Sequence, residues 1–357
     1  MNPTSSAFPA ALCVLFAGCS ALPVKEPSGP TTIAFGACSD QDREQPIWDA
    51  IVATEPDLFV FAGDNIYGDT EDMAVLRAKY GQLESVPGYQ RLVGTCPVLA
   101  VYDDHDYGKN DGGREYPMRA ESAKMCLDVF GVPEDDPRRE HEGIYGATIM
   151  GDPGRRVQVI LLDTRYFRDP IDRGTLNAEE RREANVVGWY EPTDDTARTL
   201  LGETQWRWLE AELRKDAEVR LIVSTIQAVP WEKGMECWGN MPHERQRLFD
   251  LIGSTRAGGV LFLSGDVHFA EISRSEEGPY PLYDFTSSGL TQSPHPTWPA
   301  AVNRYRLPGM LHVGENFGLV RLDWDADETQ VRMQACTVEG KVAFEQIVPL
   351  DRLRAAE

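Results

Sequence analysis

Five short apolar runs in this sequence each lead into a group of polar residues of the kinds that bind metals or catalyse reactions. The polar groups stand at residues 38–40, 64–69, 103–107, 225–227 and 266–268, and they contain Asp, His, Cys, Tyr, Asn and Gln. Apolar runs of this length are typical of buried β-strands. Because α/β sheets bind ligands at the carboxyl ends of their strands, the pattern predicts one polar site at a sheet edge.

The order of predicted elements limits the architecture. The chain has 357 residues, of which 42% are hydrophobic, so it can bury a large core. Strands and helices alternate up to about residue 263, residues 169–200 are predicted to be a long surface excursion, and strands dominate after that. This order predicts an α/β (α+β) fold, a four-layer α/β/β/α sandwich of two mixed sheets flanked by helices. Residues 31–350 are expected to form one domain, and residues 351–357 a tail. Helices are predicted at residues 46–54, 71–83, 118–130, 202–215 and 242–252.

The first 30 residues are expected to be a leader that is separate from the domain. Residues 7–18 form an apolar segment that is too short to span a bilayer. Phe16–Cys19 (FAGC) resembles a bacterial lipobox, so we predict a lipoprotein-type signal peptide at 1–18, a lipidated Cys19 and a linker at 19–30. The protein is then expected to be exported, to the periplasm or another extracytoplasmic site, and to meet the membrane only through this lipid. A plain cleaved signal peptide is the alternative.

The net charge of −22 restricts the possible partners. No basic patch could dominate such a field, so we expect no nucleic-acid-binding surface. A phosphate-ester substrate remains compatible with the charge, because a bound cation reverses its sign locally. A monomer is expected. The spacing of the later cysteines shows no zinc pattern and leaves open whether Cys96 and Cys126 pair.

The polar strand ends favour a metal site. Asp64, Asp104 and Asp266 would repel one another if they met at one edge, and their pKa values would rise unless cations neutralised them. Only six histidines are present, and two of them, His105 and His268, fall in these strand ends. Asp266 and His268 are two residues apart, so they would point to the same side if the chain stayed extended.

Three motifs resemble those of the calcineurin-like metallophosphoesterases: GDNIY at 63–67, DDH at 103–105 and GDVH at 265–268. More narrowly, they are similar to the alkaline phosphatase D (PhoD-like) family, which is related to the purple acid phosphatases. LDTR at 162–165 and LGETQW at 201–206 are also similar to that family, and the resemblance covers roughly residues 31–325. It implies the metallophosphoesterase type of sandwich and the hydrolysis of phosphate mono- or diesters.

The resemblance also implies a metal centre of Fe³⁺ and Ca²⁺, with other divalent metals possible in the same sites. Cys38, Tyr67 and His268 would bind the iron. Asp64 would bridge the two metals, and the remaining ligands would bind the second one. The residues that the motifs assign to the metals are Cys38, Asp64, Tyr67, Asp104, Gln227, Asp266 and His268.

Three further residues are candidates for contact with the substrate. His105 would not be a ligand; it would assist the leaving oxygen as a general acid. Arg165 could hold a phosphate oxygen, with a structural salt bridge as the alternative. Asn65 could contact the substrate or only stabilise its turn.

Two of the candidate metal ligands have structural alternatives. Cys38 could also be a small buried hydrophobic residue, and Tyr67 could pack in the core.

The remaining expectations concern the rim of the site and competing functions. Trp189 and Trp206 are expected in the core, whereas Trp231 and Trp238 flank a glycine-containing loop that could line a substrate rim. Asp69 is expected to be a turn residue. The alternatives to the hydrolase are a non-catalytic surface lipoprotein that binds metal or phosphate, and a phospholipase D-like activity on the same centre.

Overall fold

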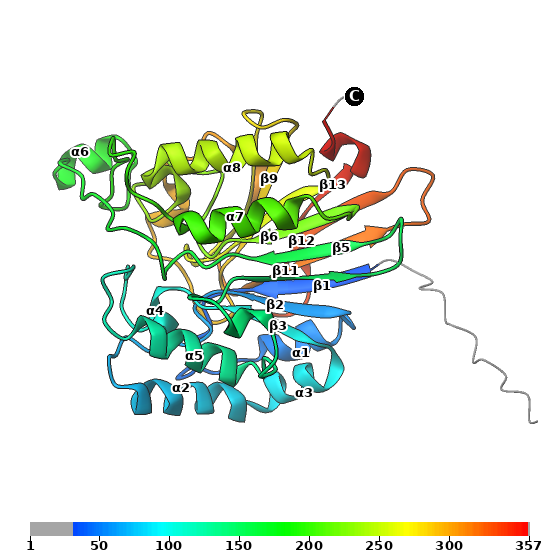
Figure 1. Ribbon diagram of the computed structural model, residues 1–357, viewed down its shortest axis with the longest axis horizontal. Coiled ribbons are helices and arrows are strands. Elements are labelled where there is room, and N and C mark those ends of the chain that lie inside the picture. Colours follow the sequence, from blue (N-terminus) through cyan, green and yellow to red (C-terminus); the bar gives the residue numbers. More distant parts are fainter. Residues whose placement is uncertain (1–30, 356–357) are drawn as a thin grey trace, which may run out of the picture.

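Two mixed β-sheets lie face to face at the centre of the protein, and helices cover both outer faces (Figure 1). The structure is a computed structural model that describes residues 31–355. The predicted signal peptide (1–18), Cys19 and the linker (19–30) lie outside the described residues. The observed layers confirm the four-layer α/β/β/α sandwich expected from the sequence.

The first sheet contains the two N-terminal strands whose ends carry predicted site residues. Alternate side chains of these strands face opposite sides, as the two-residue period of a strand requires. Phe35 packs against Phe285 of the second sheet, with ring centroids 4.9 Å apart, whereas Phe59 packs against Trp48 of an outer helix at 5.6 Å. In spatial order the strands are β13 (Val342–Pro349), β12 (Gln330–Thr337), β11 (Asn316–Asp323), β1 (Thr31–Gly36), β2 (Leu58–Ala62) and β3 (Val98–Val101).

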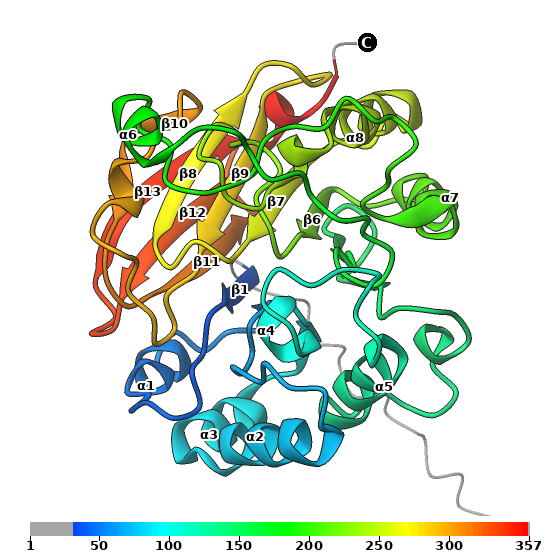
Figure 2. The same cartoon turned by 90° about the vertical axis from the view of Figure 1, so that its left-hand side faces the viewer.

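The second sheet has a parallel centre formed by β5, β6, β7 and β9. These strands are buried along their whole length, as expected for parallel strands that are covered on both faces. In spatial order the strands are β10 (Arg306–His312), β8 (Ala270–Ser275), β9 (Leu282–Ser287), β7 (Val260–Ser264), β6 (Val219–Val223), β5 (Val157–Leu161) and β4 (Gly146–Met150). The carboxyl ends of β1, β2 and β7 meet at one edge of the sandwich, which faces the viewer in Figure 2.

Helices cover the two sheets separately. The helices α1, α2, α3 and α5 lie against the first sheet, and α7 and α8 lie against the second (Figure 1). The five predicted helices are present as α1, α2, α5, α7 and α8. The bounds are α1 (Ile47–Val52), α2 (Met73–Ser85), α3 (Pro87–Thr95), α4 (Asp104–Tyr107), α5 (Arg119–Val129), α6 (Ala178–Glu183), α7 (Gly202–Leu213) and α8 (Pro242–Thr255), with 3₁₀ turns η1 (Pro137–Arg139), η2 (Trp238–Asn240), η3 (Trp298–Ala300) and η4 (Leu350–Leu353).

Several elements were not expected from the sequence, namely α3, α4, α6 and β10. The DDHD segment forms the single helical turn α4, which is closed by reciprocal hydrogen bonds between Asp103 and Asp106. One turn is too short to show a helical pattern of apolar residues, so the sequence gives no periodic signal for it. The predicted tail begins inside η4, where Leu353 is fully buried.

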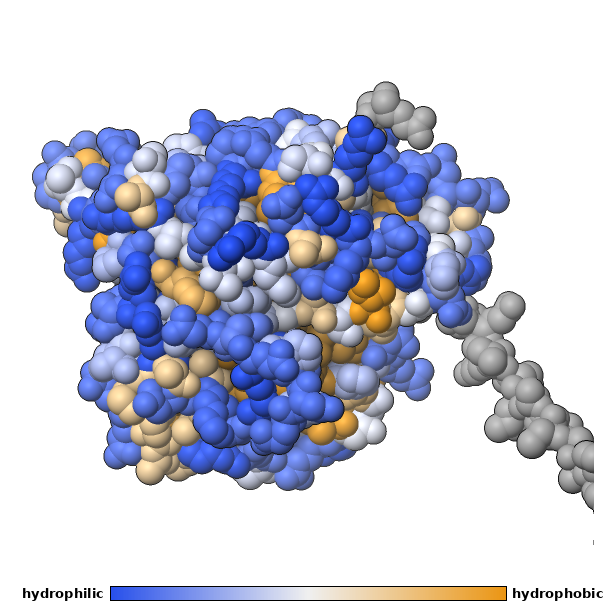
Figure 3. All heavy atoms as spheres, in the orientation of Figure 1, coloured by the Kyte–Doolittle hydropathy of each residue, from blue (hydrophilic) through white to orange (hydrophobic). Residues whose placement is uncertain are grey.

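One face of the described domain is mostly polar. The face shown in Figure 3 is mostly hydrophilic, with small hydrophobic patches that are separated from one another. Between residues 31 and 355, no helix combines the length and the apolar character that crossing a bilayer requires.

Candidate metal centre

The turns that follow β1, β2 and β7 place the candidate ligands through left-handed backbone conformations. The φ angles are 62° at Cys38, 49° at Asp64, 71° at Asp266 and 61° at His268. The chain is therefore not extended from Asp266 to His268, and the expected strand alternation does not explain why both line the same pocket. A sharp turn explains it, because the Val267 N–H donates to the Gly265 carbonyl at 2.9 Å and the His268 N–H donates to Ser288 Oγ at 2.9 Å.

Gly265 allows ligands from the two sheets to converge. A Cβ atom at this position would lie 2.6 Å from the Ala37 Cβ and 2.7 Å from the Ala62 carbonyl oxygen. Any side chain here would push the end of β7 away from the ends of β1 and β2. The glycine is therefore required by the close approach of the strand ends that carry the candidate ligands.

A first group of candidate ligands consists of Cys38, Asp64 and His268. One ligand atom of each residue lies within 4.8 Å of the others. Tyr67 joins this group, because its hydroxyl lies 3.1 Å from His268 Nε2. Cys38 Sγ lies 3.1 Å from Ser288 Oγ and donates to Asp64 Oδ2 at 3.4 Å. The structure thus brings together the four residues that the motifs assigned to the iron or to the bridge.

Two further groups share members with the first one. Asp64 and Asp104 form a group with His105, and Asp104 forms another with Asp103 and Asp266, again with ligand atoms within 4.8 Å. Asp64 therefore stands between the Cys38 group and Asp104. This is the place that a ligand bridging two cations would take.

A fourth group, which no sequence motif indicated, consists of Asp104, Asp111 and Glu236. Asp111 donates its backbone N–H to Asp104 Oδ2 at 2.7 Å, and it accepts a hydrogen bond from the Tyr190 hydroxyl at 2.6 Å. Asp111 and Glu236 lie in loops and do not follow an apolar strand. Only the three-dimensional contact between distant loops reveals them.

The electrostatics of the centre disfavour the charged forms of several ligands. Burial raises the pKa of the Cys38 thiol, and the Asp64 carboxylate raises it further. Burial, followed by repulsion from Asp104, raises the pKa of Asp64, and burial also raises the pKa of Asp266. Burial lowers the pKa of His268 to about 4. A cation among these groups would favour the thiolate, the carboxylates and the neutral imidazole together.

Unpaired oxygen atoms at the centre fit a cation. Asp104 Oδ1 and Asp103 Oδ2 are buried and have no hydrogen-bond partner in the described part of the chain. Buried polar atoms normally find a partner, so these acceptors require an explanation. Oxygen ligands suit hard cations, whereas Cys38 and His268 suit a transition metal. The donor set therefore fits two cations of different preference.

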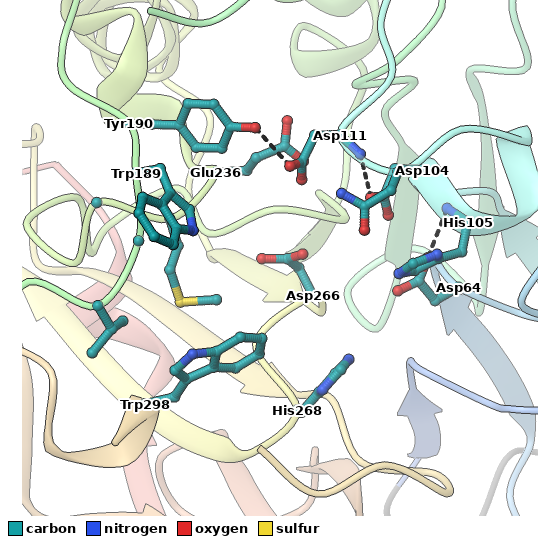
Figure 4. Close-up of a pocket in the computed structure, with 15 residues that line it drawn as sticks. Asp64, Asp104, His105, Asp111, Trp189, Tyr190, Glu236, Asp266, His268 and Trp298 are labelled. Carbon is teal, nitrogen blue, oxygen red and sulfur yellow. Dashed lines mark hydrogen bonds between the residues drawn. The ribbon is translucent and has the colours of Figure 1, made fainter. Parts of the chain in front are cut away.

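His105 lies beside Asp64 and Asp104 in the pocket (Figure 4). Its Nδ1 lies 2.8 Å from Asp69 Oδ2, and its ring lies 4.3 Å from the Tyr67 ring, measured between centroids. Burial would lower the pKa of His105, but the carboxylates of Asp64, Asp69 and Asp104 raise it to about 11. Asp69 was expected to be only a turn residue, and it also orients this imidazole.

Arg165 is completely buried behind the acidic groups. Its Nε donates to Asp103 Oδ1 at 2.5 Å and its Nη1 donates to Glu236 Oε2 at 2.6 Å. Its Nη2 lies 3.9 Å from Asp104 Oδ1. The guanidinium does not line the pocket. These contacts favour the salt-bridge alternative over the predicted contact with a substrate phosphate.

Replacing Arg165 by methionine is expected to destabilise the protein by about 3–5 kcal/mol, because two buried carboxylates would lose their cation. Thermal unfolding of the metal-loaded protein measures this. The matched control is Arg114→Met, which removes an exposed ion pair to Asp169 and should cost less than about 1 kcal/mol. An unchanged melting temperature together with a raised KM would instead restore the predicted substrate contact of Arg165.

The side chain of Asn65 faces the interior. Its Nδ2 donates to the Val101 carbonyl at 3.1 Å and to Asp106 Oδ2 at 2.6 Å. The residue is fully buried and does not line the pocket. These contacts favour the turn-stabilising alternative over the predicted substrate contact.

The prediction that Gln227 binds the second metal is not supported. Its Nε2 donates to Glu271 Oε1 and to Thr286 Oγ1, at 2.8 Å each, and its Oε1 accepts from Lys233 Nζ at 2.7 Å. A neighbouring ammonium group repels a cation. The side chain therefore belongs to a buried network beneath the site and not to the candidate ligands.

The pocket above the candidate ligands has a volume of about 240 Å³. Trp189 and Trp298 line it, whereas Trp231 and Trp238 do not. Trp189 is 56% exposed, so its expected place in the core is wrong. Trp238 is fully buried. The prediction that Trp231 and Trp238 line the rim is therefore wrong. Their position beside a loop in the sequence does not show which loops meet in the fold.

The five cysteines of the described chain are buried free thiols, Cys96 and Cys126 included. Only Cys38 has further candidate ligands around it.

Comparisons with known proteins agree with these observations. The family model for PhoD-like phosphatases matches residues 33–333. The alkaline phosphatase D of Bacillus subtilis (strain 168) is 24% identical over 214 residues, which cover 54% of this chain and 34% of that protein. The match therefore spans about a third of that relative's length.

Solved structures show a similar fold. The structure of PhoD has a TM-score of 0.68 at 18% identity and covers 90% of this chain and 68% of its own. GAP50, described as the anchor in the inner membrane complex of Plasmodium, has a TM-score of 0.55 at 13% identity and covers 92% and 90%. A dimetal phosphatase from Danio rerio has a TM-score of 0.50 at 14% identity and covers 90% and 99%. At these identities the likeness concerns the fold alone. Since the family model matches most of the chain, this protein belongs to the PhoD-like phosphatase family.

Proposed function

We propose that this protein hydrolyses phosphate esters at a metal centre. The centre is formed at the carboxyl ends of four strands, β1, β2, β3 and β7. One observation carries the proposal: the groups of candidate ligands overlap, with Asp64 and Asp104 each shared between groups whose atoms lie within 4.8 Å. Overlapping groups of this kind suit two neighbouring cations. Two-metal sites are a common arrangement in enzymes that act on phosphate.

For the cations we propose Fe³⁺ and Ca²⁺. Cys38, Tyr67 and His268 would hold the iron with Asp64, because thiolate, phenolate and imidazole suit a transition metal. Asp104 and Asp266 would hold the calcium with Asp64, because Ca²⁺ prefers carboxylate oxygens. When bound, such cations would neutralise the phosphate and lower the pKa of an attacking water.

The chain's own residues would then position the substrate and move a proton. His105 would hold a proton near the pocket and give it to the leaving oxygen, and the Asp69 carboxylate beside its ring raises its pKa and so favours the protonated form. Asp69 would fix the ring through the hydrogen bond to Nδ1. Arg165 would hold Asp103 and Glu236 in place from behind.

A non-catalytic binding protein is the competing function, because a neighbour of the same fold is described as an anchor. His105 argues against it for this chain. A binding site needs its ligands, but it gains nothing from an imidazolium that is oriented by Asp69 at the edge of the pocket. The candidate metal ligands by themselves would suit a hydrolase and a non-catalytic binding protein equally well.

The test is the elemental content of the protein as purified without added metal, combined with hydrolysis of 4-nitrophenyl phosphate and bis(4-nitrophenyl) phosphate. We expect about one iron together with calcium per chain, and hydrolysis that a chelator abolishes. Paired zinc or manganese with activity would contradict the iron site at Cys38 and Tyr67 only. Bound metal without hydrolysis of any ester would leave the binding protein as the better account.

A further inference from the structure

The pocket has two chemically different sides. Asp64, Asp104 and His105 lie on one side, and the indole rings of Trp189 and Trp298 lie away from them in the view of Figure 4. Trp298 also approaches the candidate ligand His268, with ring centroids 5.5 Å apart. A ligand held at the acidic side by cations would therefore extend toward the two indoles that line the rest of the pocket.

The aromatic side is built from segments that are far apart in the sequence. Residues 187–190 bind residues 233–234 through backbone hydrogen bonds, such as the one from the Tyr190 N–H to the Gly234 carbonyl at 2.8 Å. A Cβ atom at Gly188 would lie only 1.9 Å from the Gly234 carbonyl oxygen, so the two loops touch directly. The Val302 N–H donates to the Asn185 carbonyl at 3.0 Å and ties the Trp298 loop to the same segment. Hydrogen bonds between these loops therefore hold the aromatic side of the pocket in place.

Trp189 is unusual among the exposed residues. It is 56% exposed and is the single aromatic residue among the large exposed hydrophobic residues of the described chain. The Arg181 guanidinium lies 3.5 Å from the centroid of its ring and holds one face of the indole. A large apolar ring that is held in place and exposed at a pocket mouth is typical of a binding surface.

The charges of the pocket limit what can lie against the indoles. The residues that line it include no Lys or Arg. Arg165 and Arg168, which lie behind it, are tied to Glu236. A second phosphate group on the substrate would therefore find no Lys or Arg among the lining residues, because the Arg181 guanidinium lies against the Trp189 ring and does not itself line the pocket. A flat uncharged group would find two indole rings.

We propose that Trp189 and Trp298 select phosphate esters whose organic group is a flat aromatic ring, and that they bind this ring while the metal centre binds the single phosphate. The inference rests on the proposed function for the phosphate end. Stacking on an aromatic side chain is worth up to about a hundredfold in affinity and does not require a specific hydrogen bond.

The test uses two inert phosphate analogues that differ only in the ring, phenylphosphonate and methylphosphonate. Their binding to the metal-loaded protein is measured by titration calorimetry. We expect phenylphosphonate to bind about tenfold more tightly than methylphosphonate. Trp189→Ala and Trp298→Ala should each remove most of this preference and leave the affinity for methylphosphonate within about twofold.

Two control variants separate the loss of stacking from a general disturbance of the folded structure. Trp189→Phe keeps a ring and should keep most of the preference. Leu176→Ala removes an exposed apolar side chain from the same excursion, outside the pocket, and should change nothing. Equal affinity of the wild-type protein for both phosphonates would overturn the ring site and leave the proposed function intact. Failure to bind either phosphonate would overturn the proposed phosphate site and the ring site with it.

Discussion

Replacing Asp64 by asparagine is expected to lower phosphate-ester hydrolysis by about a thousandfold or more and to reduce the bound metal, because this carboxylate is shared between two ligand groups. The same change should raise the melting temperature of the metal-stripped protein. Burial and the Asp104 carboxylate raise the pKa of Asp64, so its charge is costly when no cation is present. Asparagine also tolerates the left-handed φ of 49° at this position. Elemental analysis and melting curves with and without chelator measure both effects.

The matched control is Asp163→Asn, another fully buried aspartate that lies outside the ligand groups. Asp163 accepts hydrogen bonds from the Tyr102 hydroxyl at 2.6 Å and from the Ile144 N–H at 2.9 Å. Its substitution should lower the melting temperature in the stripped and the loaded protein alike, since it removes satisfied acceptors. If Asp64→Asn behaved like Asp163→Asn in the stripped protein, the repulsion argued for the centre would be wrong.

Replacing His105 by alanine is expected to lower kcat by about 10²–10⁴-fold with unchanged metal content, because a general acid would be lost while the ligands remain. The loss should be larger for an alkyl phosphate ester than for a 4-nitrophenyl ester. A poor leaving oxygen needs the proton, whereas 4-nitrophenolate leaves without it. The measurement is kcat for both esters beside the metal content of the same samples.

Asp69→Asn serves as the companion variant, since Asp69 acts on the reaction only through the His105 ring. It should reduce kcat less than His105→Ala does and should show the same dependence on the leaving group. A fall in bound metal in His105→Ala would make His105 a ligand, as its place in a group with Asp64 and Asp104 would allow. Activity losses that are equal for both esters would remove its role as a general acid.

The sequence predicted the parts of the site that follow strands. Apolar runs identify buried strands, and the residues after them must lie at one edge, so Cys38, Asp64, Asp104 and Asp266 could be brought together from the pattern. The two-sheet sandwich also followed from the order of strands and helices. These features depend on neighbours in the chain, which a sequence shows directly.

Other parts of the site depend on contacts between distant loops, which no pattern of neighbouring residues could predict. Asp111, Trp189 and Glu236 follow no strand, and hydrogen bonds such as Tyr190 to Asp111 bring their loops together. The contacts of Arg165 and Gln227 do not support their predicted roles at the substrate and the metal, for a related reason. Both follow strands, but their side chains turn into buried ion pairs and hydrogen bonds that only the packed interior supplies.

The left-handed turns at the strand ends have a consequence for the history of such a chain. Cys38, Asp64, Asp266 and His268 hold side chains in a conformation that costs about 1–2 kcal/mol more for them than for glycine. Selection for stability alone would replace these residues, so the site lowers the stability of the fold that carries it. A descendant that was released from its chemistry would drift toward glycine or asparagine at these four positions and would become more robust as it did so. Within a lineage, those substitutions would mark the branch on which the reaction was abandoned.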